Sequence, residues 1–213
     1  RPKWSSDKWG RNKYGTPPQG NADYAFFQHI IASMKPISGR SAILYPHGIL
    51  FRDQEKDMRE KIVEADLIEC VIGLGPNLFY NSPMNSCVVI SRSNKPAGKK
   101  GKILFIDAVK HIREEKNMAY LDPEHIQAIA EAYSKWNDVE GFSKVVDIEE
   151  IQANKSRLSI PLYVKTQTDD GDQRDFPEMI EEWLQCSNEF RSSMNNLLHR
   201  LDGLSPKRGE KDD

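Results

Sequence analysis

Residues 67–91, LIECVIGLGPNLFYNSPMNSCVVIS, are the stretch that decides the fold. Their two ends, 67–74 and 87–90, are nearly continuous apolar runs rich in β-branched residues, which is typical of strands covered on both faces in an α/β sheet. The loop between them, 75–85, contains two prolines and three asparagines, which stop either strand. This loop holds the aromatic pair Phe79 and Tyr80 beside the sheet, where α/β proteins usually bind ligands.

The composition predicts one globular core with a small appendage, since the chain has 213 residues of which 38% are hydrophobic. The formal charge of -2 excludes the global basic field that is typical of an autonomous nucleic-acid binder. Of the three cysteines, Cys70 and Cys87 lie in apolar strands and Cys186 lies elsewhere, so we expect reduced, buried thiols and a cytoplasmic protein. The chain has no apolar run of the roughly 18 to 20 residues that cross a bilayer, so we expect no membrane association.

The first segment, residues 1–19, is basic and aromatic and follows the period of neither a helix nor a strand. Its cations and aromatic rings could contact phosphates and bases. The candidate DNA-binding residues are Lys3, Trp4, Lys8, Arg11 and Lys13. The alternative is a surface loop anchored by two tryptophans, and the sequence leaves both interpretations open.

The rest of the compact part alternates helical and strand patterns, which predicts an α/β fold. We expect a helix over 21–34, capped by Asn21 or Asp23, with an apolar stripe of Ala25, Phe26, His29, Ile30 and Met34. Further predicted elements are a buried strand at 40–45, a helix at 55–64 with Met58, Ile62 and Val63 inside, a strand at 103–107, a helix at 122–136 with Ile126, Ile129, Ala130 and Tyr133 inside, a strand at 142–146, a short acidic helix at 147–151 and a closing segment at 158–164. Residues 99–102 are interpreted as a solvated basic hairpin tip.

Motifs for catalysis or metal binding are missing from these 213 residues. No histidines, cysteines and carboxylates occur at metal-ligand spacing. Gly73-Leu74-Gly75 lacks the third glycine of a dinucleotide fingerprint and precedes a proline loop instead of a helix. His29 and His47 stand alone in sequence, and such histidines are more often packed or capped groups than catalytic ones.

The C-terminal part has a different character. Residues 166–175 are polar and glycine-bearing, as in a linker, and residues 203–213 form a charged tail that we expect to be disordered. Between them, 176–202 is predicted to be an amphipathic helix, because its apolar residues are spaced alternately four and three apart. The candidate partner-binding residues on it are Ile180, Trp183, Phe190, Met194 and Leu197. The helix could equally fold back on its own domain.

An ordered series of short motifs resembles the modification subunit of type I restriction-modification systems. The matching segments are NADYAF at 21–26, GRSA at 39–42, PHGILF at 46–51, VIGL at 71–74, NLFY at 77–80, CVVI at 87–90, GKILFIDA at 101–108, EGFS at 140–143 and LSIPLYV at 158–164. No single segment is decisive, but their succession over residues 4–164 is specific.

This resemblance implies an N6-adenine DNA methyltransferase that uses S-adenosylmethionine. The implied fold is the C-terminal half of a Rossmann-like class I methyltransferase sheet, followed by a C-terminal helical segment. The implied partners are double-stranded DNA, a specificity subunit, a restriction subunit and a second copy of the modification subunit. The family extrudes its target adenine from the duplex and stacks it on an aromatic ring. Phe79 matches that ring and Tyr80 is the fallback; the alternative for Phe79 is a core aromatic at a hairpin end.

The sequence also departs from the family. The catalytic Asn-Pro-Pro-Phe or Asn-Pro-Pro-Tyr tetrapeptide is not present, and Thr16-Pro17-Pro18-Gln19 lacks both its Asn and its aromatic residue. The glycine-rich loop and acidic residue that bind the methyl donor are also missing, so no catalytic or cofactor-binding residue is assigned. We expect residues 1–165 to be a partial catalytic domain, the acceptor-side half, which is inactive alone. One alternative is a non-catalytic module that docks on a specificity subunit through its C-terminal helix; an unrelated dinucleotide-binding protein is disfavoured by the missing phosphate loop.

Overall fold

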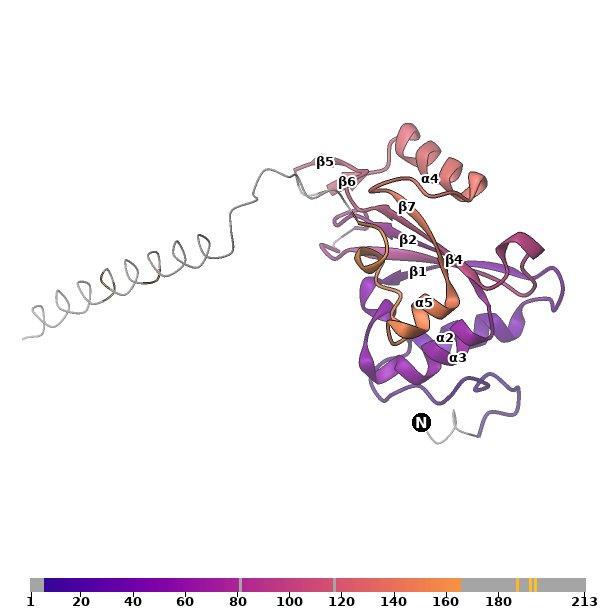
Figure 1. Ribbon diagram of the computed structural model, residues 1–213. Coiled ribbons are helices and arrows are strands. Elements are labelled where there is room, and N and C mark those ends of the chain that lie inside the picture. Colours follow the sequence, from indigo (N-terminus) through magenta and orange to yellow (C-terminus); the bar gives the residue numbers. More distant parts are fainter. Residues whose placement is uncertain are drawn as a thin grey trace, which may run out of the picture. The chain divides into compact units, whose positions relative to one another are not determined.

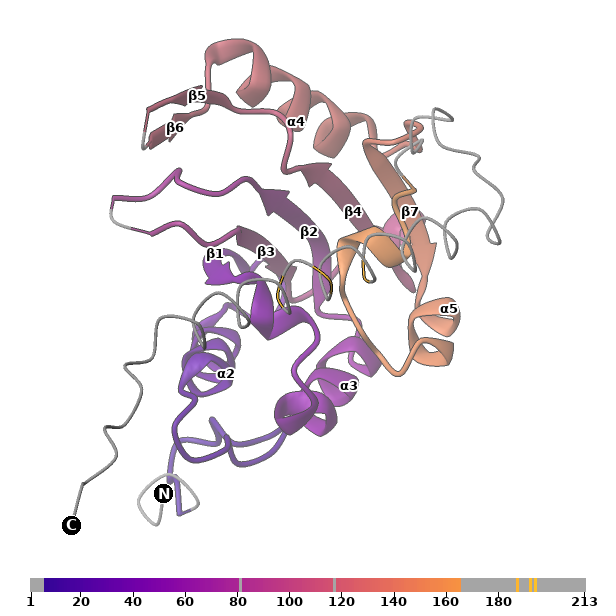
Figure 2. The same ribbon diagram turned by 90° about the vertical axis from the view of Figure 1, so that its left-hand side faces the viewer.

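The computed structural model describes residues 6–80, 82–116 and 118–165, together with Ser187, Ser192 and Met194. The chain divides into two units, residues 1–167 and 168–213. The first unit is a five-stranded mixed sheet with helices on both faces (Figures 1 and 2). In the second unit, the three described residues have helical conformation.

The order of strands in the sheet determines which loops lie together. In space the strands are β1 (Arg40–Pro46), β3 (Ser86–Arg92), β2 (Ile68–Leu74), β4 (Lys102–Ala108) and β7 (Ser143–Asp147). β3 is antiparallel to β1 and β2, β2 is parallel to β4, and β7 is antiparallel to β4. Strands β1, β2 and β4 therefore point the same way, and their carboxyl ends share one edge of the sheet.

The helices cover the two faces unequally. The helical elements are α2 (Asp23–Ser33), η1 (His47–Leu50), η2 (Asp53–Glu55), α3 (Lys56–Glu64), η3 (Ala97–Lys99), α4 (Pro123–Lys135), α5 (Ile148–Ala153) and η4 (Ile160–Leu162). Helices α2, α3 and α5 lie on one face and α4 lies on the other (Figure 2). The larger core cluster lies on the first face, where Phe105 stacks on Tyr163 with ring centroids 4.5 Å apart.

Several predicted elements are confirmed. All seven residues of β2 are buried, as expected of a strand covered on both faces. In α3 the predicted inner residues Met58, Ile62 and Val63 are buried. Cys70 and Cys87 are free, buried thiols. The predicted carboxyl-edge loop at 75–85 also connects β2 and β3 as expected.

The predicted inner face of α2 is wrong. Its buried residues are Tyr24, Phe27 and Gln28, whereas Phe26 is 63% exposed and His29 is exposed. A glutamine can occupy the inner face because its amide is satisfied: Gln28 Nε2 donates to the Gly15 carbonyl (2.9 Å), and Oε1 accepts the Tyr14 N–H (3.0 Å). The N-cap is Ala22, without a side-chain cap, so neither Asn21 nor Asp23 serves as predicted.

Two further expectations need correction in the sheet. The predicted buried strand β1 is an edge strand, and Leu44 in it is 46% exposed. The β2–β3 hairpin lies inside the sheet, because β4 and β7 extend it beyond β2. Residues 99–102 form no hairpin tip, since β2 lies between β3 and β4; Lys99 instead pairs with buried Glu69 (3.1 Å) and lies 3.8 Å from the Trp136 ring centroid.

Helix α4 begins as predicted but faces the sheet differently. Asp122 and His125 form a reciprocal capping box, and Pro123 follows the cap. The helix packs on the second core cluster through Ala132, Ile129 and Tyr133, while the predicted inner residues Ile126 and Ala130 are exposed. Across the described ranges, no helix is both long and apolar enough to span a bilayer.

Candidate functional site

The candidate site lies at the edge of the sheet where β1, β2 and β4 end. β1 leads into η1 at His47, β2 leads into the loop at 75–85, and β4 leads through 109–112 into a small hairpin. That hairpin consists of β5 (Arg113–Glu115) and β6 (Met118–Tyr120), and the sequence patterns do not predict it. Carboxyl ends of neighbouring parallel strands are where open α/β sheets bind ligands.

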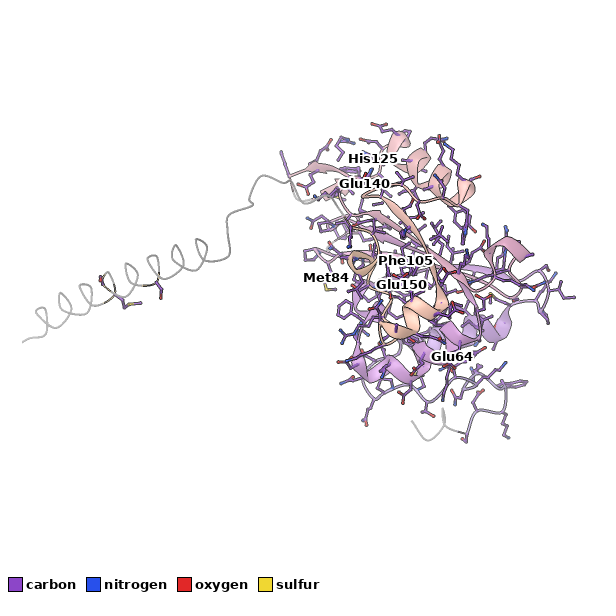
Figure 3. The ribbon with its side chains drawn as sticks, viewed as in Figure 1. Glu64, Met84, Phe105, His125, Glu140 and Glu150 are labelled. Carbon is purple, nitrogen blue, oxygen red and sulfur yellow. The ribbon has the colours of Figure 1, made fainter. Side chains whose placement is uncertain are left out.

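The loop at 75–85, called here the aromatic loop, presents rings to solvent. Phe79 is 39% exposed and Tyr80 is 90% exposed. A tight turn shapes the loop tip, in which the Ser82 N–H donates to the Phe79 carbonyl oxygen (3.0 Å). Met84, also on this loop, is 64% exposed and projects from the body of the domain (Figure 3). Exposing three large apolar side chains on one loop is unfavourable in water, which is typical of a binding surface.

The β5–β6 hairpin braces the aromatic loop. The Ala119 N–H donates to the Asn77 carbonyl oxygen (2.9 Å), and Asn77 has a left-handed backbone with φ of 58°. In the hairpin, Ala119 lies opposite Glu114. The hairpin is itself anchored, because Arg113 pairs with Asp122 (2.9 Å) and lies over the Tyr120 ring. The position of Phe79 therefore depends on an element that follows it by some forty residues.

A cavity of about 360 Å³ opens at the same edge, and it is called here the Asp107 cavity. Its lining includes His47 after β1, Asn85 before β3, Asp107 near the end of β4, His111 beyond it and Ile160 of η4. Glycines allow these elements to meet. A Cβ at Gly73 would lie 2.7 Å from Ile160 Cδ1, and one at Gly75 would lie 2.6 Å from the Val109 carbonyl oxygen.

Both histidines of the cavity have a lowered pKa, which favours the neutral imidazole. Burial lowers the pKa of His47, while a hydrogen bond to the Ser86 backbone and the charge of Asp107 act in the opposite direction. Burial also lowers the pKa of His111, reinforced by His125 and opposed by Asp107. Within the described residues, His47 Nε2 and His111 Nδ1 are buried without a hydrogen-bond partner. The cavity thus combines one carboxylate with two uncharged imidazoles.

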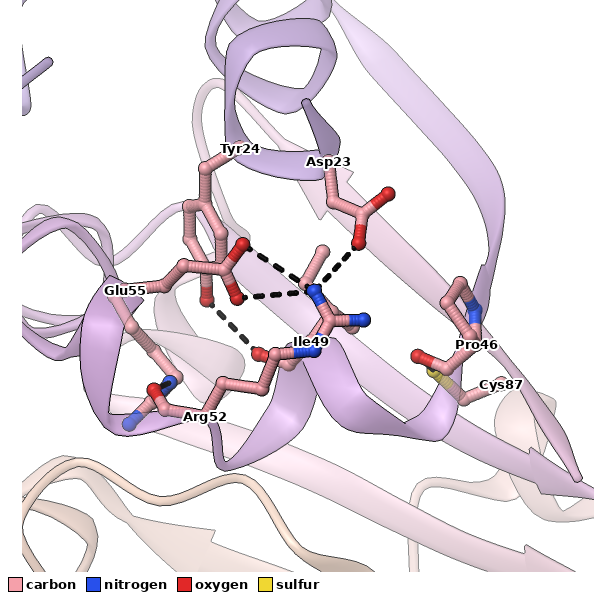
Figure 4. A network of polar contacts seen from close by, with 8 residues as sticks. Asp23, Tyr24, Pro46, Ile49, Arg52, Glu55 and Cys87 are labelled. Atoms are coloured by element: carbon pink, nitrogen blue, oxygen red, sulfur yellow. Dashed lines mark hydrogen bonds and ion pairs between the residues drawn. The ribbon is translucent and has the colours of Figure 1, made fainter. Parts of the chain in front are cut away.

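A polar network holds the turn that leads out of β1 (Figure 4). Arg52 Nη1 donates to Asp23 (2.8 Å) and to buried Glu55 (3.4 Å), and the Tyr24 hydroxyl donates to the Ile49 carbonyl oxygen (3.2 Å). Burial raises the pKa of Glu55, and the charge of Arg52 partly offsets this. The network connects α2 to η1 and η2 and so positions His47 at the edge.

Of the candidate DNA-binding residues of the N-terminal loop, the three that the structure describes do not converge on this edge. Lys3 and Trp4 lie outside the described residues. Lys8 is exposed, Arg11 forms an ion pair with Asp7, and Lys13 lies 5.6 Å from the Tyr14 ring centroid. The loop lies beside α2 and α3, away from the β5–β6 hairpin (Figures 1 and 2). Trp9 does not anchor it, being 80% exposed; buried Tyr14 does.

The candidate partner-binding helix lies almost wholly beyond the described part. Of its five candidate residues the structure describes only Met194, which is helical and 42% exposed. Ile180, Trp183, Phe190 and Leu197 lie outside the described residues, as do Cys186, the predicted linker and the tail. Residues 6–80, 82–116 and 118–165 contain no group of three potential ligands arranged to bind a metal.

Comparison with known proteins identifies the family. The N-6 DNA methylase family matches residues 2–172. The chain belongs to this family. It is 37% identical to the MjaVIII methylase subunit of a type I restriction enzyme from Methanocaldococcus jannaschii, over 95% of the chain. It is 34% identical to the HindI methylase subunit from Haemophilus influenzae, over 79% of the chain. The resemblance to type I modification subunits is thereby confirmed.

Solved structures agree with this assignment. The type I methyltransferase subunit from Streptococcus thermophilus superposes with a TM-score of 0.71 at 33% identity, over 77% of this chain and 35% of that one. The M protein of the type I restriction enzyme EcoKI shares the fold, with a TM-score of 0.57 at 17% identity over 92% of this chain. This N-6 DNA methylase chain spans 38% of the MjaVIII subunit and 39% of the HindI subunit.

Sequence reasoning found the aromatic loop but missed the cavity beside it. Asn85 lies far from Asp107 and His111 in sequence, and no spacing rule connects the three residues. A sheet order of β1-β3-β2-β4 brings them to one edge, and that order is not evident from periodicity. The available signal was that each residue stands at or just beyond an end of a predicted strand.

Proposed function

We propose that this chain is the acceptor-side half of a type I N6-adenine DNA methyltransferase subunit, which transfers a methyl group from S-adenosylmethionine to N6 of adenine. The observation that carries the proposal is the aromatic loop, held at the carboxyl edge of a sheet that is like that of a type I methyltransferase subunit. In fold terms, the sheet is the C-terminal half of a Rossmann-like methyltransferase sheet. The chain alone is inactive, because acceptor and donor must both be held at near-attack distance.

Phe79 receives the extruded adenine on its ring, with Tyr80 as the fallback. The N6 amine is shielded by pairing and stacking inside a duplex, so the base must leave the helix before it can react. Phe79 suits this role because it is partly exposed but fixed by the turn at Ser82 and the brace at Asn77. Tyr80 is almost fully exposed at the loop tip and has fewer constraints on its position.

The methyl-donor site lies outside the described residues of this chain. Donor sites of this kind need glycines whose missing side chains leave room for the cofactor. Gly73 and Gly75 do not provide such room, because protein atoms of η4 and of the segment after β4 fill the space where a Cβ would stand. We therefore assign no donor-binding residue and derive no step through the cofactor.

The free edge of β1 also supports a donor site outside the described residues. This edge strand is seven residues long and hydrogen-bonded only to β3 within the described sheet. An unprotected edge of this length is a template for further strand pairing. Leu44 on β1, Phe26 on α2 and Ile37 between these two elements are exposed apolar residues. We propose that the donor half of the methyltransferase continues the sheet there.

Substitution of Phe79 in the complete methylase subunit tests the stacking role. Stacking of a base on an aromatic ring contributes roughly 1 to 3 kcal/mol, so Phe79→Ala should weaken methyl transfer about 5- to 150-fold, mainly through KM for DNA. Phe79→Trp should retain most of the activity, and Phe51→Ala is the control because Phe51 is similarly exposed but follows η1 instead of standing on the loop. Equal loss in Phe79→Trp and Phe79→Ala would contradict the stacking role.

Calorimetric titration of the isolated chain with S-adenosylmethionine tests the assignment of the donor site. We expect no heat of binding from this chain and clear binding by a complete methylase subunit titrated in parallel. Binding by the chain would mean that it contains a donor site, and the acceptor-side assignment would then be wrong.

We further propose that the protein works in the cytoplasm with double-stranded DNA, a specificity subunit, a restriction subunit and a second methylase subunit. The C-terminal segment is the proposed contact with the specificity subunit, through residues that include Trp183 and Phe190. Replacing both by Glu should abolish co-purification with the specificity subunit while the melting temperature of the chain is retained. A fall in the melting temperature would show instead that the helix packs on its own domain.

A further inference from the structure

The Asp107 cavity contains a carboxylate that its surroundings do not neutralise. One Asp107 oxygen accepts the Val109 N–H (3.1 Å), and the side chain is only partly exposed. Within the described ranges Asp107 forms no ion pair, and Lys110, which also lines the cavity, is an exposed residue at its rim. A carboxylate has about four acceptor positions, so most of its capacity stays available for a ligand with N–H groups.

The rest of the cavity wall suits a mainly apolar ligand. Val109, Ile160 and Pro161 contribute apolar surface, and neutral His47 and His111 add two aromatic rings. A volume of about 360 Å³ is within the usual range for small-molecule sites, which are largely apolar with a few placed polar groups. Asn85, the last residue of the aromatic loop, also lines the cavity, and its side-chain amide can both donate and accept hydrogen bonds.

We propose that the Asp107 cavity binds a nucleobase through its exocyclic amine, which donates a hydrogen bond to the Asp107 carboxylate. The assignment rests on the proposed function, since that function brings bases to this edge. In the family, the catalytic tetrapeptide accepts hydrogen bonds from the amine of the target adenine, so this cavity is a second base subsite. Its occupant is a base displaced from DNA or a free nucleoside, which share the same amine.

Titration of the purified chain with two nucleosides tests the proposal directly. Adenosine and purine riboside differ only in the exocyclic amine, and binding is followed by changes in amide chemical shifts. We expect adenosine to bind at least ten-fold more tightly, with the largest shifts at residues 107–111. Asp107→Asn should reduce this preference at least five-fold, whereas Asp57→Asn, at an exposed position on α3, should leave it unchanged.

Several results would overturn the proposal. Among them are equal binding of the two nucleosides, an unchanged preference in Asp107→Asn, and displacement of adenosine by inorganic phosphate at equal concentration, which would indicate an anion site. If Asp107→Asn fails to fold, as judged by circular dichroism, the binding of the two nucleosides to the unaltered chain still tests the proposal. No binding of either nucleoside at 10 mM, on the order of the weakest affinity of interest, also counts against it.

A second experiment shows whether the base comes from DNA or from a free nucleoside. It also distinguishes failure of this proposal from failure of the proposed function. A duplex with adenine opposite an abasic site offers a base that leaves the helix at low cost. If the duplex shifts residues 107–111 and the nucleoside does not, the occupant comes from DNA; the reverse result assigns a free nucleoside. In the complete methylase subunit with its specificity subunit, transfer to DNA that is indifferent to Asp107→Asn would refute only a second subsite for a base from DNA. Absence of transfer by the unaltered subunit in that same assay would refute the proposed function itself.

Discussion

At the scale of single residues, the two glycines at the end of β2 show how chemistry motifs can mislead. Gly73-Leu74-Gly75 resembles the start of a nucleotide-binding fingerprint, but both glycines are packing contacts against Ile160 and Val109. Their role is to let η4 and the segment after β4 approach the sheet closely. The same approach forms the wall of the Asp107 cavity, so these glycines affect ligand binding only through backbone packing.

Gly75→Ala should therefore destabilise the fold. Its Cβ would lie 2.6 Å from a backbone oxygen, which cannot rotate away as a side chain could. Overpacking of this kind typically costs about 1 to 3 kcal/mol, which urea unfolding can measure. Gly98→Ala is the matched control, because a Cβ at Gly98 would have no neighbour within 4 Å, and it should change stability by less than about 0.5 kcal/mol. Equal stability of the two variants would contradict this packing role.

Buried thiols should make stability depend on alkaline pH. Burial raises the pKa of Cys87 from near 9 to about 12, and its thiol faces the Pro46 carbonyl oxygen at 3.9 Å (Figure 4). Between these two values the unfolded chain releases the proton and the native chain retains it. The free energy of unfolding should consequently fall as pH rises, by roughly 1 kcal/mol per thiol at pH 9.5. Cys87→Ala should lose less stability than the unaltered chain between pH 7.5 and 9.5; identical losses would be inconsistent with a buried Cys87 thiol.

At the scale of elements, the β5–β6 hairpin is the part that connects fold and site. The Ala119 N–H donates a hydrogen bond to the Asn77 carbonyl oxygen. The sequence of the hairpin has no apolar pattern from which it could have been predicted. The hydrogen bond connects the hairpin to the aromatic loop, where the rings of Phe79 and Tyr80 are exposed. The loop and the hairpin should thus open together or stay closed together.

Removing this one hydrogen bond should free the aromatic loop. Ala119→Pro deletes the N–H, whereas Ala119→Gly deletes only the methyl group, so the pair isolates the bond to Asn77. Chymotrypsin cleavage after Phe79 or Tyr80 under native conditions should be several-fold faster in the proline variant than in the glycine variant. Similar cleavage rates in the two variants would show that the hairpin does not restrain the loop.

The sequence predicted well those elements whose burial follows a simple periodic pattern. β2 is buried along its whole length and α3 has one clear apolar side, so periodicity is sufficient for both. Periodicity failed for α2 because Gln28 takes an inner position through hydrogen bonds to 14–15, which no pattern encodes. Periodicity failed for β1 because the burial of an apolar strand depends on its position in the sheet, and β1 has a neighbouring strand only on one side within the described sheet.

At the scale of the whole molecule, strand order explains both the site and its limits. The order β1-β3-β2-β4-β7 places the aromatic loop, the Asp107 cavity and the β5–β6 hairpin at the carboxyl ends of β1, β2 and β4. It also leaves β1 without a neighbouring strand, within the described sheet, on its side away from β3. Family resemblance anticipated the aromatic loop, but not the cavity, whose residues come from separate elements. The chain spans little more than a third of the MjaVIII subunit, at 38%, so the donor side must be tested with added protein.

Methyl transfer by recombined halves is the measurement that tests the central claim most directly. The chain, a donor-side fragment of a type I methylase subunit, and their mixture are each incubated with a specificity subunit, DNA and tritiated S-adenosylmethionine. The proposed function predicts transfer to adenine N6 by the mixture and none by either half, with Phe79→Ala lowering the transfer by the mixture. Transfer by the chain alone would contradict the acceptor-side assignment, as would a mixture that binds both substrates but transfers nothing.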